Sequence, residues 1–429
     1  MKIRNLFILF SAGLFSLVAA IFYPAGLADK IWLQGGHIDG YTMYKAMEMS
    51  VKAPGKDIYN YEALLAYQSA DSSSKQMRVS PYLYPPQASF FMKPLLFFGS
   101  PLRFMAALLF TDWIMRLFIV ALMCLLLLKQ SAFQTGSAYT KQAFWPFLAV
   151  ALLSLSMFTT PAKNTVINVQ VSGIIAGLLF AALFAANTGK SIWARGLLLA
   201  AGFLKVYPLI FGLFILKPRL KSYLFLLFNG TVLSLLIWAS GLFSATEAIS
   251  YLSPKTPYTQ GYVKWLTGFE LNCSIWQDLH SFNESGSAFG IIASVLYGGT
   301  ILLIAGTFLY MAARQYFKSQ DPSNRLLFAI ACISITLSFW PIVWINHFFI
   351  ILPFVCLAVA DTKFPLVFRI ACIVYVLIFF SGIIERSQVT RLICRYSWAN
   401  DANTILALVA LITMFRPKLL RHKPAGPAA

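Results

Sequence analysis

An aspartate near the start of the chain could supply a catalytic base. Asp39 lies in a polar segment, soon after the first long apolar run. A carboxylate whose pKa is raised towards the working pH can take a proton from a hydroxyl group. The same residue is also suited to the N-cap of a short amphipathic helix that would begin at Gly40 or Tyr41. Position alone does not decide between base and cap.

A lysine interrupts an apolar run in the middle of the chain. Lys205 lies within the stretch 195–216 and is followed closely by Pro208. An ionisable side chain inside a membrane-spanning run is costly and is functional by default. Asp112 and Arg116 also lie in one apolar run, four residues apart, so we expect them to pair with each other. The sequence therefore predicts a functional role for Lys205 and a mutual pair for the other two.

Aromatic residues border several apolar runs. A Tyr-x-Tyr-Pro-Pro segment that begins at Tyr82 precedes the apolar stretch 90–98, and its two prolines force an extended backbone. His347 stands between Trp344 and further aromatics. Such residues usually act as anchors at a membrane interface, so neither segment by itself indicates chemistry.

No group of residues has the spacing of a metal site. The first loop contains no Asp-x-Asp cluster, and the histidines, which show no paired-ligand spacing, are His37, His280, His347 and His422. We expect the protein to need neither a metal nor another cofactor.

The composition indicates an integral membrane protein. Hydrophobic residues make up 59% of the 429 positions, charged residues only 11%, and the mean hydropathy is +0.71. A soluble domain usually has about 25% charged residues. The net charge of +19 comes from basic clusters beside apolar runs, which is the pattern of the positive-inside rule rather than of nucleic-acid binding. We predict one transmembrane domain over residues 1–429 and no nucleic-acid partner.

The apolar runs predict an all-α polytopic protein with about 10–12 transmembrane helices. The N-terminal run resembles a signal sequence without a convincing cleavage site, so we predict an uncleaved first span. Both termini are predicted to be cytoplasmic, with 417–429 as a tail and with outer loops at about 25–89 and 244–287. The candidate spans are about 5–24, 104–128, 144–160, 169–187, 195–216, 221–243, 288–313, 325–344, 346–360, 366–384 and 402–416.

The stretch 195–216 does not fit a single crossing. One crossing would put Lys217, Arg219 and Lys221 outside and would reverse the sign of every later loop. We therefore predict a broken hairpin that enters and leaves on the cytoplasmic side, with its break at Lys205 to Pro208. Irregular backbone at membrane depth is tolerated only against protein or a wet cavity, so the break should face a cavity.

The predicted outer segment 385–401 contains basic residues on the side where topology does not favour them. Arg386 and Arg391 belong to this cluster. An anionic lipid phosphate would explain them, and so would an ordinary loop with partial pairing to Glu385 and Asp401. Cys273 and Cys394 are also predicted to lie outside, and no spacing decides whether they pair.

In their order along the chain, these segments resemble the GT-C integral membrane glycosyltransferases. The resemblance is closest to glycosyltransferase family 87, which includes polyprenyl-phosphate-mannose-dependent mannosyltransferases, and it covers about residues 1–360. The 168–173 segment departs from the family pattern, which leaves its role open. The segments that carry the resemblance are Asp39 with Tyr44, Tyr84-Pro85-Pro86, Asn168 to Gly173, Lys205 to Pro208, Asn272 to Ser274, and His347 with Phe348.

The resemblance implies a GT-C-like bundle with short amphipathic helices in the first extracytoplasmic loop. It implies inverting transfer of a sugar, with mannose expected, from a polyprenyl-phosphate carrier to a lipid or glycan acceptor. The site would face the periplasm from a bacterial inner membrane, among membrane lipids. By this analogy the roles are Asp39 as base, Lys163, Lys205, His347 and Arg386 as phosphate-binding cations, and Tyr44, Tyr84, Gln170 and Asn272 as substrate-binding residues.

Two other functions compete with transfer. A transporter or flippase of a polyprenyl-linked sugar would also use a broken span, but the sequence has no second broken span in a corresponding half and no internal repeat. A structural membrane subunit would leave Asp39, Lys205 and His347 without a chemical role. Nothing in the outer loops indicates which sugar or acceptor is used, or the oligomeric state.

Overall fold

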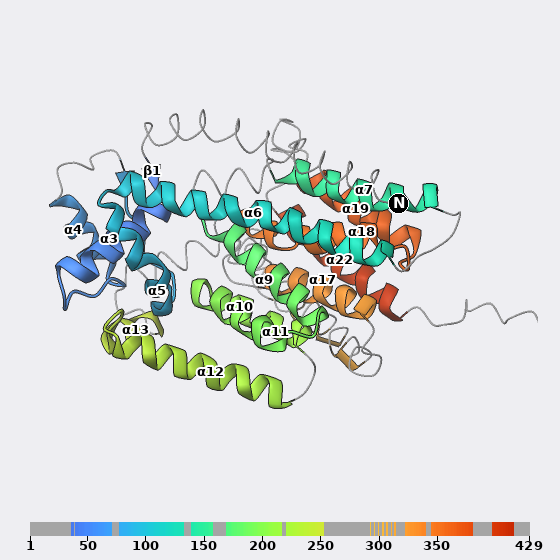
Figure 1. Ribbon diagram of the computed structural model, residues 1–429. Helices are drawn as coiled ribbons and strands as arrows, with labels where there is room; N and C mark the ends of the chain where they lie inside the picture. The colour runs from blue at the N-terminus through green and yellow to red at the C-terminus, as the bar shows by residue number, and fades with distance from the viewer. Residues whose placement is uncertain are drawn as a thin grey trace, which may run out of the picture.

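The chain folds as a helical bundle with a smaller group of helices at one end (Figure 1). The computed structural model describes residues 36–37, 39–70, 77–132, 139–157, 169–216, 220–252, 322–339, 345–380 and 397–415, with single positions between 292 and 314. Within these ranges the regular secondary structure is helical apart from two short parallel strands, β1 (Gly36–His37) and β2 (Met77–Arg78). The predicted all-α class is confirmed for this part of the chain.

The elements fall into three groups along the chain. The first group is α3 (Asp39–Lys52), α4 (Tyr61–Ser69), η2 (Pro86–Ala88), α5 (Ser89–Met92) and η3 (Lys93–Phe98). The middle group is α6 (Pro101–Ala132), α7 (Tyr139–Ser156), α9 (Ser172–Asn187), α10 (Ser191–Leu204), η4 (Tyr207–Phe211), α11 (Gly212–Ile215), α12 (Leu220–Ala239) and α13 (Ala245–Leu252). The last group is α17 (Pro322–Phe339), η5 (Ile345–Ile350), α18 (Leu352–Ala360), α19 (Leu366–Phe380) and α22 (Ser397–Phe415).

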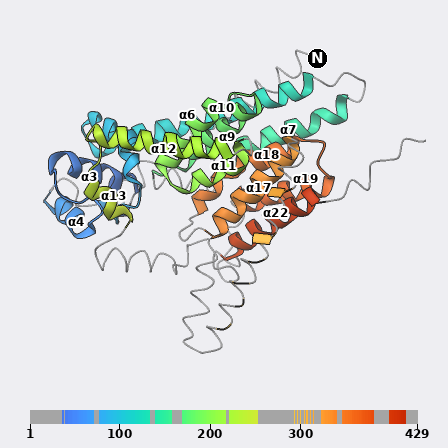
Figure 2. The same ribbon diagram turned by 90° about the horizontal axis from the view of Figure 1, so that it is seen from below.

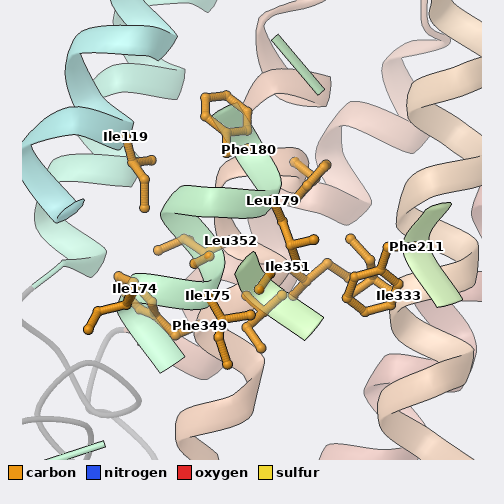
Figure 3. Packing of buried hydrophobic residues seen from close by; sticks show 14 of the residues in the cluster. Ile119, Ile174, Ile175, Leu179, Phe180, Phe211, Ile333, Phe349, Ile351 and Leu352 are labelled. Carbon is orange, nitrogen blue, oxygen red and sulfur yellow. The ribbon is translucent and has the colours of Figure 1, made fainter. Parts of the chain in front are cut away.

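Helix α9 lies at the centre of the bundle because it is apolar on every side. Most of its residues are buried, and Figure 3 shows Ile175 and Leu179 packed against Phe349 and Leu352. Glycines let α6 approach α9 closely. A Cβ on Gly177 would lie 2.4 Å from Met115 Cε. This small-residue contact is typical of helix pairs in membranes.

The short helices form what we call the loop unit, comprising α3, α4, β1, β2, η2, α5, η3 and α13. Both views place α3, α4 and α13 together at one end of the bundle (Figures 1 and 2). Asn60 caps α4 by accepting a hydrogen bond from the Ala63 amide. Ser244 and Glu247 form a reciprocal capping box at the start of α13. The loop unit therefore has its own local order.

The backbone of residues 195–216 folds back on itself as the predicted hairpin. Helix α10 ends at Leu204, and Lys205 has extended backbone with φ −149° and ψ 140°. The chain then turns back along α10. Gly202 lies against Leu209, and Gly212 lies against Leu198, so the two arms run antiparallel. Lys205 is therefore at the tip of the hairpin.

Two described helices are long and apolar enough to cross a membrane, Pro101–Leu127 within α6 and Lys221–Ala239 within α12. Several shorter apolar helices accompany them. The stretch predicted as a span at 346–360 is divided into η5 and α18, because Pro353 stands at the start of α18. The predicted span 5–24, the tail 417–429 and the cysteines Cys273 and Cys394 lie outside the described residues.

Candidate active site

Four distant segments meet beside the hairpin tip. Asp39 begins α3, Gln170 precedes α9, Lys205 follows α10, and His347 lies in η5. Their side chains form a continuous series of polar contacts. Three of the four are the predicted base and two of the predicted phosphate-binding cations. Gln170 is one of the predicted substrate-binding residues, from the 168–173 segment that departs from the family pattern.

A glycine brings Asp39 to Gln170. A Cβ on Gly40 would lie 2.6 Å from the side chain of Val169, so only glycine permits this approach of α3. Val169 has a φ of 50°, which is rare for a β-branched residue and is typical of functional sites. Helix α3 begins at Asp39, and the Asp39 carboxylate accepts a hydrogen bond from Gln170, a residue distant in the sequence. Contacts with a distant part of the chain, at Val169 and Gln170, thus hold Asp39 in the site.

Gln170 bridges the carboxylate and the ammonium group. Its Nε2 donates a hydrogen bond to Oδ2 of Asp39. Its Oε1 accepts from Nζ of Lys205 at 3.5 Å. The Gln170 amide therefore pairs with the Asp39 carboxylate, an acceptor, and with the Lys205 ammonium group, a donor, at the same time. It also separates the two charges, which a direct ion pair would bring together.

Lys205 and His347 form the second contact. Nζ of Lys205 lies 2.6 Å from Nε2 of His347. A protonated lysine has only donors, so Nε2 must accept and the imidazole must be neutral, with its proton on Nδ1. Nζ also lies 5.6 Å from the centroid of the Tyr84 ring. The ammonium group thus sits between an imidazole and an aromatic face.

The environment of Asp39 suits a general base. Burial raises the pKa of this carboxyl group to about 6, against the charge of Lys205, which lowers it. Loss of solvation disfavours the charged form of an acid, and a nearby cation favours it. Since Gln170 keeps the cation at a distance, the burial effect prevails. A carboxylate with a pKa of about 6 is ionised near neutral pH and still basic enough to accept a proton.

Tyr44 does not join this group. Its hydroxyl donates to Oε1 of Glu48 at 3.2 Å, and its ring packs edge-on against Phe104. Buried Lys45 bonds Oε2 of the same Glu48 at 2.9 Å. These contacts hold α3 within the loop unit, on a different side of the helix from Asp39. The structure therefore gives Tyr44 a packing role.

The remaining predicted residues fall in two groups. Tyr84 lies beside Lys205, as described. Lys163, Arg386 and Asn272 lie outside the described residues. In the ranges that are described, no three His, Cys, Asp or Glu side chains gather as metal ligands would.

Tyr207 lies beside the site and was not among the predicted site residues. Tyr207 packs edge-on against His347, with ring centroids 6.0 Å apart. Its signal was present, because it lies between Lys205 and Pro208 in the same short segment. The predicted Asp112–Arg116 pair is confirmed, with Nε of Arg116 2.7 Å from Oδ2 of Asp112.

The arrangement has the parts that a group transfer from a phosphate ester needs. A base with a raised pKa stands at one end of the series, and a partly buried cation, Lys205, stands between Gln170 and the neutral His347. A cation near a leaving phosphate stabilises the charge that grows there in the transition state. The base can meanwhile remove the proton of an attacking hydroxyl.

Comparison with known families agrees with this chemistry. The family model of glycosyltransferase family 87 matches residues 82–341, which is more than half of the chain. The matched region includes Tyr84, Gln170 and Lys205, while Asp39 and His347 lie on either side of it. No curated protein sequence matched this chain.

Proposed function

Because the chain belongs to glycosyltransferase family 87 and is thus a glycosyltransferase, we propose that it is an inverting enzyme with a lipid-phosphate sugar donor. The donor is a polyprenyl-phosphate-linked sugar, with mannose expected, and the acceptor is a lipid or glycan. The observation that carries the proposal is the series Asp39–Gln170–Lys205–His347, which joins a base to a phosphate-binding cation.

The reaction is a single displacement. Asp39 takes the proton of the acceptor hydroxyl as its oxygen attacks the anomeric carbon. The bond between that carbon and the phosphate oxygen breaks, and polyprenyl phosphate leaves with one more negative charge. Attack opposite the leaving group inverts the anomeric centre. Asp39 then returns its proton to solvent.

Lys205 receives the leaving phosphate in this proposal. A lysine ammonium has three N–H donors, and charge-assisted bonds to phosphate are among the strong ones. His347 and Gln170 hold Nζ in place, so that it does not need to reorganise during the reaction. Arg386 and Lys163 are further candidates for the same phosphate.

The proposed setting is a bacterial inner membrane, with many spans and with both termini in the cytoplasm. The positive-inside pattern supports this orientation. The hairpin supports it too, because its second arm runs back along α10 towards the start of that helix and is described to Leu216, directly before the basic residues in the sequence. The loop unit would then face the periplasm, where lipid-linked sugars can reach it.

Replacing Lys205 tests the phosphate site. We expect Lys205→Met to lower kcat/KM for the donor by about tenfold to a hundredfold, since a hydrogen bond to a charged group contributes about 1.5–3 kcal/mol. The assay measures labelled product from radiolabelled polyprenyl-phosphate mannose, glucose and other sugars with membrane lipid acceptors. The exposed Lys190 at the other end of α10 gives a matched control, Lys190→Met. Absence of product from every donor with the wild-type chain, or translocation without transfer, would overturn the proposal.

The pH dependence tests the base. Only the ionised form of Asp39 can accept a proton, so kcat/KM for the acceptor should rise by about tenfold per pH unit below about 6 and level off above it. The measurement is the initial rate of transfer between pH 4.5 and 8.5. In the residual activity of Asp39→Asn the limb near pH 6 should be missing. A limb that persists unchanged in this variant belongs to another group.

A further inference from the structure

A row of tyrosines connects the active site to α13. Tyr84 lies beside Lys205, and its ring is 5.6 Å from that of Tyr82. Tyr82 lies 5.4 Å from Tyr59, which lies 5.6 Å from Tyr251 of α13. The four rings are tilted against one another and form a continuous, largely buried series of ring contacts. We call these four residues the tyrosine row.

Several hydroxyl groups in and beside this row lack partners. Within the described part of the chain, the hydroxyls of Tyr82, Tyr84 and Ser250 are buried and make no hydrogen bond. Tyr59 differs, because its hydroxyl donates to the carbonyl of Tyr84 at 2.7 Å. A buried polar group without a partner costs free energy and is uncommon in native proteins. Three such groups near one another favour a polar ligand at this place.

A carboxylate lies beside the row. Glu247 is buried on α13, and its charge acts on both Tyr82 and Tyr59. Burial, followed by this charge, raises the pKa of the Tyr82 phenol above its usual range, so that the hydroxyl remains a donor. The row thus combines aromatic faces, hydroxyl groups and an acceptor carboxylate.

This combination fits a carbohydrate. A sugar ring has an apolar C–H face that packs on aromatic rings and hydroxyl groups that both donate and accept hydrogen bonds. Ligand sites generally join an apolar surface with a few placed polar groups. A purely lipidic ligand would leave the buried hydroxyls unsatisfied, whereas a sugar would satisfy them.

We propose that the tyrosine row is the binding subsite for the sugar portion of a glycan or glycolipid acceptor. The proposal rests on the proposed function, because it takes Lys205 as the donor phosphate site. Lys205 contacts both His347 and Tyr84. The acceptor therefore reaches Asp39 along the row, while the donor phosphate occupies the side of His347.

Removal of one hydroxyl tests the subsite. Tyr82→Phe should weaken binding of a methyl glycoside by about threefold to tenfold, which corresponds to one hydrogen bond. Binding is measured by saturation-transfer NMR with methyl glycosides of mannose, glucose and N-acetylglucosamine, on the full chain in a sugar-free detergent. Tyr251→Leu, which removes one aromatic face, should weaken it as well. Tyr61→Phe, in the same loop unit but outside the row, is the matched control.

The thermal unfolding midpoint separates binding from packing. Because the Tyr82 hydroxyl has no partner in the ligand-free chain, Tyr82→Phe should leave the midpoint unchanged or raise it. Equal glycoside binding by the wild type and Tyr82→Phe overturns the proposal, and so does a wild-type chain that binds none of the glycosides. Consumption of the donor is measured in parallel. If the wild type consumes donor but the glycoside test fails, only the subsite is wrong; if no donor is consumed, the proposed function itself fails.

Discussion

Asp39→Asn should lower the rate of sugar transfer by about 10²–10⁴-fold, which is the usual contribution of a general base. Asparagine has the same shape as aspartate, and its carbonyl oxygen can still accept the hydrogen bond from Gln170. The variant therefore keeps the contact between α3 and the segment before α9. It loses only the ability to take a proton. The loss should appear in kcat, with donor binding nearly unchanged.

The same substitution at a second aspartate of the loop unit provides the control. Asp57 accepts a hydrogen bond from the Tyr59 amide, and an asparagine can accept it too. Asp57→Asn should thus retain wild-type activity and the wild-type unfolding midpoint. Equal product from the wild type and Asp39→Asn would remove Asp39 as the base. The series Asp39–Gln170–Lys205 would then be a structural network.

Much of the hairpin could be predicted from the sequence because charge placement and a break coincide there. Lys217 to Lys221 exclude a single crossing, and a lysine followed by Pro208 interrupts the apolar run. The break is a local signal, and the charge signal comes from the signs of this loop and of the loops that follow it. They place Lys205 at the tip of the hairpin, where the structure has it. The functional interest of this lysine followed from its cost in an apolar segment.

The partners of Lys205 could not be predicted in the same way. Gln170 and His347 are far from it in the sequence, and each is positioned by a packing contact of a different kind. Gln170 depends on the close approach of Gly40 to Val169, whose positive φ has no sequence signature. Hydrophobic periodicity specifies which elements form, but not which ends of them meet. The same holds for the tyrosine row, which joins three separate segments.

The buried pair Asp112–Arg116 was predicted as a pair, and the structure gives it a wider role. NH1 of Arg116 donates to the carbonyl of Met157 at the end of α7, at 2.6 Å. Its guanidinium lies 4.9 Å from the Phe349 ring centroid, two residues after His347. The carboxylate of Asp112 lies against Gly173, where a Cβ would come within 1.9 Å of Oδ1. One ion pair thus braces the segments that carry Gln170 and His347.

Arg116→Met should be the most destabilising of the changes considered. It leaves the Asp112 carboxylate buried without its counter-charge, which typically costs about 3–5 kcal/mol. The unfolding midpoint in detergent measures the loss. Arg103 lies on the same helix but is exposed, so Arg103→Met should leave the midpoint unchanged. A similar midpoint for Arg116→Met and the wild type would show that the pair contributes little.

The double variant Asp112→Leu with Arg116→Met separates stability from positioning. Replacing both members of a buried pair by apolar residues is often neutral or stabilising, so most of the lost stability should return. The bond to the Met157 carbonyl and the guanidinium contact with Phe349 do not return, however. We therefore expect a stable protein whose kcat stays below that of the wild type while the pH limb near 6 remains. Recovery of both stability and kcat would mean that the pair serves folding alone, because the segments of Gln170 and His347 would then keep their places without it.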